Sequence, residues 1–238
     1  MIAYGRRLIL VCSIALAMPA LPAAPVRAAD VRDCGLSVLT GAPHATTDLA
    51  RLRTSTAPAD AYQLAQAYAA GTIVAQDCKA AAQLMSTAAT AHVAAAENGL
   101  GELYRSGAGV AASDHDAAKW FRAAYNDGDP RGMFNFGRAV AQGKAFEYGQ
   151  IAAVTTGSNF AGASVMHASS GADWSLVASI WSAAADKGDA LAAYDLGKLL
   201  ENGAEGVRID RVRARQLYQL AADAGVPNAQ QSLEAMNH

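Results

Sequence analysis

Apolar side chains recur in four segments of the chain with the spacing of one face of an α-helix. The clearest segment runs from Ala117 to Tyr125, where apolar residues follow the order i, i+3, i+4, i+7 and i+8. This spacing predicts an amphipathic helix that buries one face. The same pattern begins again at Ala81, Val177 and Ala214.

A second helical segment precedes each of these and ends at a glycine. The four segments read LAQAYAAG, LGELYRSG, FGRAVAQG and LGKLLENG, and they end at Gly71, Gly107, Gly143 and Gly203. These glycines are 36, 36 and 60 residues apart, and the amphipathic segments begin 36, 60 and 37 residues apart. The long interval comes after the third glycine but before the third amphipathic segment, so the extra residues lie inside the third unit. A nearly fixed period predicts a repeat protein.

Each unit is therefore expected to be a helical hairpin, in which an A helix is followed by a B helix. Leu233 stands in register with Leu196, so the tail is expected to form one more helix that covers the end of the stack. The predicted repeats occupy 60–95, 96–130, 131–189 and 190–225, with a C-terminal capping helix at 227–236.

Three of the A helices contain a glycine at equivalent points, namely Gly101, Gly137 and Gly197, whereas the first unit has Ala65 there. A glycine inside a helix costs about 1 kcal/mol relative to alanine. We expect these structural glycines, called the packing glycines below, to let a neighbouring helix backbone approach closely.

The third unit carries an insertion of 24 residues within 144–174. The insertion is rich in small and polar residues, but it contains the aromatic residues Phe146, Tyr148, Phe160 and Trp174. Long insertions in repeat proteins are often functional, and aromatic residues are common anchors at interfaces. We expect these four residues either to contact a partner or to fold back onto the repeats.

The first 28 residues have the pattern of a secretory signal peptide. Arg6 and Arg7 precede a 14-residue apolar run, and small residues at Val26 and Ala28 suit cleavage after Ala28. A membrane anchor is the alternative, but the apolar run is short for a membrane span. Cleavage would remove three arginines and no acid, which changes the formal charge from -2 to -2 - 3 = -5. We thus expect an exported protein without a later membrane span, with an N-terminal extension at 29–59.

Two cysteines remain in the mature chain, Cys34 and Cys78. An even number of cysteines in an exported protein favours a disulfide. Two free thiols are the alternative.

No motif for catalysis, for a cofactor or for a metal is found. The cluster Asp114-His115-Asp116 is better explained as the start of a helix with Ser113 as its N-cap. The near-neutral charge gives no indication of nucleic acid as a partner. We therefore expect no catalytic, cofactor-binding or metal-binding residues.

The motifs LGELYRSGAGV, from Leu100, and AAKWFRAAYNDGD, from Ala117, resemble the Sel1-like repeat family. LGKLLENGAEGV with YQLAADAG is the next best match, and the resemblance covers about residues 60–238. It implies an all-α fold, a right-handed α-solenoid of about four helical hairpins similar to tetratricopeptide repeats.

The resemblance also implies a function. It implies a periplasmic or secreted, non-catalytic protein–protein interaction adaptor of the bacterial envelope. Such an adaptor would serve in regulation, for example restraint of a sensor kinase, or in assembly, for example that of surface polysaccharides. A partner protein would bind the concave face or the insertion in the third unit. An exported enzyme of the penicillin-binding or β-lactamase-like type and a glycan-binding module are the alternatives.

Overall fold

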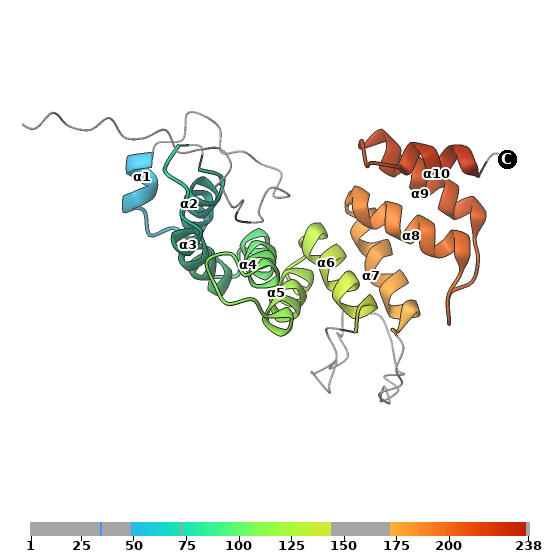
Figure 1. Cartoon of the computed structure of the whole chain (residues 1–238), viewed down its shortest axis with the longest axis horizontal. Coiled ribbons are helices and arrows are strands. Elements are labelled where there is room, and N and C mark those ends of the chain that lie inside the picture. The colour runs from blue at the N-terminus through green and yellow to red at the C-terminus, as the bar shows by residue number, and fades with distance from the viewer. Residues whose placement is uncertain (1–33, 35–48, 72, 144–171, 237–238) are drawn as a thin grey trace, which may run out of the picture. The chain divides into compact units, whose positions relative to one another are not determined.

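A computed structural model describes residue 34 and residues 49–71, 73–143 and 172–236. These parts of the chain form helices and connecting turns, with no named strand among them, so the predicted all-α class is confirmed (Figure 1). The helices are α1 (Leu49–Thr54), α2 (Pro58–Ala70), α3 (Cys78–Thr90), α4 (Ala94–Ser106), α5 (Asp114–Asn126), α6 (Pro130–Ala141), α7 (Trp174–Asp186), α8 (Ala190–Asn202), α9 (Arg211–Asp223) and α10 (Ala229–Ala235).

Helices α2 to α9 pair as four hairpins, because each helix packs on the next one along the chain (Figure 1). The A helices are α2, α4, α6 and α8, and the B helices are α3, α5, α7 and α9. Helix α4 also contacts α6, and α10 packs on α9. The proposed signal peptide at 1–28 and most of the extension at 29–59 lie outside the described residues.

Most of the repeat helices begin at a side chain that accepts hydrogen bonds from free backbone N–H groups. Ser113 Oγ accepts one from the Asp116 N–H at 3.1 Å, as expected from the sequence. Aspartates cap five other helices in the same way, and such a cap is worth about 1 kcal/mol. These caps are Asp77, Asp129, Asp173, Asp189 and Asp210.

The packing glycines leave room mainly for an aromatic ring and less for a backbone. A Cβ on Gly101 would lie 2.6 Å from the Phe121 ring, and one on Gly197 would lie 2.9 Å from the Tyr218 ring. The Ala117 and Ala214 carbonyl oxygens are farther away, at 3.2 and 3.4 Å. Our expectation of close backbone approach is therefore modified: in each case a ring from the following B helix fills the space.

In the third unit, too, an aromatic ring of the B helix fills the space beside the packing glycine. A Cβ on Gly137 would overlap Nε1 of Trp181. That indole N–H donates to the Phe134 carbonyl at 3.2 Å, so its polar atom has a partner inside the core. The hairpin of α6 and α7 thus forms despite the insertion between them.

The buried apolar residues form two clusters. One contains residues of α2, α3 and α4 together with Cys34, and the other runs from α5 to α10. Tyr104 packs against both clusters.

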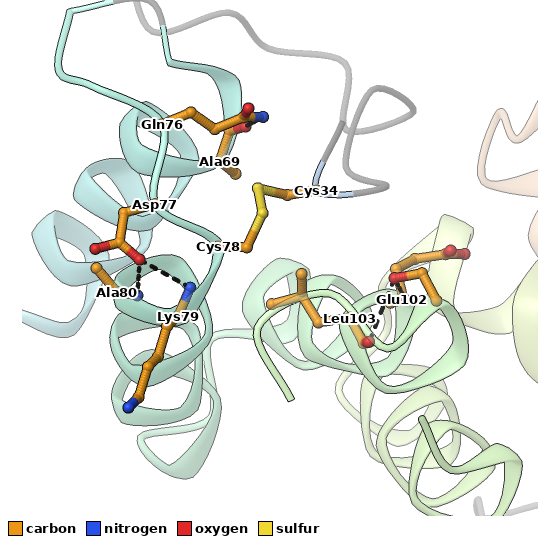
Figure 2. The surroundings of a disulfide bond; sticks show 10 residues. Cys34, Ala69, Gln76, Asp77, Cys78, Lys79, Ala80, Glu102 and Leu103 are labelled. Atoms are coloured by element: carbon orange, nitrogen blue, oxygen red, sulfur yellow. Dashed lines mark hydrogen bonds between the residues drawn. A yellow bond between two sulfur atoms is a disulfide. The ribbon is translucent and has the colours of Figure 1, made fainter. Parts of the chain in front are cut away.

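The first cluster includes the cysteine pair (Figure 2). Cys34 lies at disulfide-bonding distance from Cys78, the first residue of α3, and their Cα atoms are 5.5 Å apart. Cys34 is fully buried and belongs to the same cluster as Ala69 and Leu103. The bond would therefore attach the segment before α1 to the first repeat.

Candidate functional site

The residue after each packing glycine is polar. It is Glu102 in α4, Arg138 in α6 and Lys198 in α8. Arg138 and Lys198 are exposed. Helix α4 contacts α6, and the charge of Arg138 in α6 acts on Asp195 in α8, so these side chains belong to one polar region along the A helices, in which Glu102 is buried. We call this region the A-helix face and define it as Asn98, Glu102, Arg105, Asn135, Arg138 and Lys198.

A buried hydrogen-bond network joins two repeats at this face. Nδ2 of Asn135 donates to Oδ1 of Asn98 at 2.8 Å and to Oε1 of Glu102 at 2.9 Å. Nε of Arg105 donates to Oε2 of Glu102 at 2.9 Å. Buried polar groups that satisfy one another hold side chains in fixed positions. The network therefore fixes the orientation of α4 and α6 at the candidate surface.

Cationic side chains border this network in α6. The guanidinium groups of Arg131 and Arg138 lie 5.7 and 5.5 Å from the centre of the Phe134 ring. Arg131 also pairs with the buried Asp189 carboxylate, with Nε 3.0 Å from Oδ2. Further along the face, burial raises the pKa of Asp195, while the charges of Lys198 and Arg138 oppose that rise. The charges of α6 and α8 therefore act on one another across the repeat boundary.

A small pocket of about 250 Å³ lies among α4, α5 and α6. Its wall combines Arg105, Asn135 and Arg138 of the A-helix face with apolar residues such as Phe121. Pockets that bind small molecules usually measure about 300 to 1,000 Å³. This one is better matched to a single side chain of a partner.

A second group of polar side chains lies between the first two repeats. His92, Glu97 and Asp127 bring a ring nitrogen and two carboxylates within 4.8 Å of one another. Burial raises the pKa of Glu97 to about 7, the Asp127 carboxylate adds to that rise, and His92 opposes it. No other such group of three or more histidine, cysteine or acidic side chains occurs in the described parts of the chain.

Only one of the four aromatic residues of the insertion lies in the described residues. Trp174 is the first residue of α7, is half-buried and packs against the larger apolar cluster. Phe146, Tyr148 and Phe160 lie outside the described residues.

The A-helix face was missed by sequence reasoning, although one signal was present. The position after each packing glycine is polar and differs between repeats, as Glu102, Arg138 and Lys198 show. A position that varies in this way indicates a role that the repeats do not share.

None of the helices in the described ranges is both long enough and apolar enough to cross a membrane.

Comparison with known proteins agrees with the repeat architecture. A family model described as the Sel1 repeat matches residues 58–92, 94–129 and 190–226, which correspond to the first, second and fourth hairpins. No curated protein matches the chain.

Two solved structures share the fold. One is a protective antigen of uropathogenic Escherichia coli strains, described as displaying an SLR fold, with 23% identity and a TM-score of 0.61 over 76% of this chain. The other is a Sel1 repeat protein from Oxalobacter formigenes, with 28% identity and a TM-score of 0.58 over 74% of this chain. The match covers 34% of the first structure and 62% of the second, so both are longer than the region they share with this chain. From its three matching repeats and its solenoid of helical hairpins, the chain belongs to the Sel1 repeat family.

Proposed function

We propose that this protein is an exported, non-catalytic adaptor of the bacterial envelope that binds another protein through its A-helix face. Sel1 repeats are in general protein–protein interaction modules. The observation that carries the proposal is the pair of exposed cations that follow two of the packing glycines, Arg138 and Lys198. Both side chains lie outside the buried contacts between helices, whereas Glu102 is buried and helps to join α4 to α6.

The chemistry of the A-helix face indicates a polar segment of a partner. Arg138 and Lys198 present exposed cationic groups, and the network around Asn135 holds the neighbouring amides in place. The pocket beside Arg138 has room for one side chain. Preorganised polar groups of this kind contribute specificity at protein interfaces.

Site-specific photocrosslinking tests this surface. A photoreactive amino acid at Arg138 should capture a discrete partner in envelope extracts, while the same amino acid at Lys119, exposed on α5, should not. Once the partner is identified, the Arg138→Glu/Lys198→Glu variant should bind it at least about tenfold more weakly, and Lys119→Glu should bind it normally. Equal binding by both variants would exclude the A-helix face as the interface.

Export is supported by the predicted signal peptide and by the two cysteines at bonding distance, since disulfides persist in oxidising compartments. Mass spectrometry of the protein isolated from its host should give a mature N-terminus at Ala29. A full-length protein recovered from the cytoplasm would contradict export without bearing on the A-helix face.

A further inference from the structure

The second residue after each B helix has a positive φ angle; it is glycine after three of the B helices and histidine after the other. Gly128, Gly188 and Gly225 follow the ends of α5, α7 and α9 with φ angles of 86°, 91° and 76°. At the equivalent point after α3 stands His92, with φ 60°. A residue with a side chain rarely adopts this conformation, and glycine adopts it readily. The histidine is therefore placed where the fold itself would favour glycine.

The His92 side chain faces two carboxylates. Its Nδ1 is 3.0 Å from Oδ2 of Asp127, which follows the end of α5, and 3.6 Å from Oε1 of Glu97 in the first turn of α4. These side chains come from two different repeats. The His92 side chain is 78% exposed, so the group is open to solvent on one side.

The Glu97 carboxylate is the unusual member of the group. Its side chain is only 2% exposed, and Oε2 has no hydrogen-bond partner among the described residues. Burying a carboxylate is costly unless a charge or a hydrogen bond compensates for it. A bound cation would compensate for the burial of this carboxylate and would also attract the second carboxylate and the imidazole nitrogen beside it.

We propose that His92, Glu97 and Asp127 bind a divalent transition-metal ion, most readily zinc, with His92 Nδ1 and one oxygen of each carboxylate as ligands. Zinc binds imidazole nitrogen and carboxylate oxygen at about 2.0–2.2 Å in tetrahedral geometry, which separates the ligand atoms by about 3.3 Å. The separations of 3.0 and 3.6 Å from Nδ1 bracket that value. Calcium and magnesium favour sites made of oxygen alone, so the imidazole selects against them.

Bound metal would connect the end of α3 to the hairpin of α4 and α5. Three protein ligands leave a fourth position on the solvent side, which water or a side chain of another molecule can fill. This inference does not depend on the A-helix face.

Calorimetric titration of the full chain with zinc chloride, after removal of metals by EDTA, tests the proposal. The parent protein should bind one zinc ion per chain, and its melting temperature should rise with zinc. The His92→Gly variant should lose at least about tenfold in affinity and should not respond to zinc in a thermal melt. Glycine suits the φ angle at this position, so the variant should melt at or above the temperature of the metal-free parent.

His115→Ala, a change in a histidine outside the group, serves as the matched control and should bind zinc like the parent. A parent protein that binds no zinc overturns the proposal. Equal binding by the parent and by His92→Gly also overturns it, because the metal would then occupy other groups.

Discussion

At the scale of the residue, a missing side chain on one helix is matched by a large ring on the next. Gly101, Gly137 and Gly197 face Phe121, Trp181 and Tyr218. The rings are buried, and Tyr218 also donates its hydroxyl hydrogen to Glu201 at 2.6 Å. A side chain on any of these glycines must therefore displace a packed ring, and at Gly137 and Gly197 a hydrogen bond also holds that ring in place.

The Gly197→Leu variant is expected to lose about 1–3 kcal/mol of unfolding free energy, because overpacking forces the Tyr218 ring to move. Urea denaturation followed by circular dichroism measures the loss. Lys198→Leu, the neighbouring exposed position on α8, is the control and should change stability by less than about 0.5 kcal/mol. Similar losses in both variants would contradict the packing role of the glycine.

The buried Glu97 carboxyl gives the metal-free protein a pH dependence. Its pKa in the folded state, about 7, is above the ordinary value of 4.5, mainly because of burial, and Asp127 and Asp129 act in the same direction against His92. The stability associated with this group is therefore fully present below pH 4.5 and is lost as the pH rises through 7. In EDTA, we expect a loss of about 2–3 kcal/mol between pH 5 and 8 that is absent in Glu97→Gln.

At the scale of the element, apolar periodicity was sufficient to find the helices. The spacing around Phe121, Trp181 and Tyr218 predicted the B helices, and the glycines at Gly71, Gly107, Gly143 and Gly203 marked the ends of the A helices. Local patterns of this kind are set by helix geometry, which every repeat shares.

The candidate sites could not be predicted in the same way, because they depend on how helices cross. His92 and Asp127 are 35 residues apart and meet only because α3 and α5 both end beside α4. Asn135 and Asn98 are 37 residues apart and meet between adjacent A helices. No short motif encodes such contacts, and only a full alignment of the repeats points to the positions involved.

The cap of α8 has a larger role than the other aspartate caps. Oδ1 of Asp189 accepts from the Ala192 N–H at 2.8 Å, and Oδ2 pairs with Arg131 of the preceding repeat. Asp189 is buried, so its removal leaves Arg131 without its anion.

We expect Asp189→Ala to lower the unfolding free energy by about 3 kcal/mol, because it leaves Arg131 unpaired. Asp210→Ala is the control: it removes an exposed cap from α9 and should cost only about 1 kcal/mol. Thermal melts of the two variants make the comparison. If Asp210→Ala has the larger effect, the pairing with Arg131 contributes little.

At the scale of the whole molecule, the cysteine pair joins the segment before the repeats to the start of α3. We propose that the two cysteines form a disulfide, closing a segment of the chain with a sequence separation of 44 residues. In the chain-entropy model, such a loop stabilises the fold by up to about 4 kcal/mol.

Reduction should therefore lower the melting temperature of the parent protein. The Cys34→Ser/Cys78→Ser variant should melt near the reduced parent and should not respond to the reductant. Mass spectrometry without reduction should show a mass lower by two hydrogens than that of the reduced chain. A melting temperature that is insensitive to the reductant, with no change in mass, would show that the thiols are free.

The division of the interior into two apolar clusters, with Tyr104 touching both, also bears on how the protein opens. Neighbouring repeats contribute to stability mainly through their shared interfaces, so one half can exchange its amide protons by local unfolding while the other stays closed. Cys34 belongs to the smaller cluster, so reduction of the proposed disulfide would loosen α2 to α4 first and leave α5 to α10 protected.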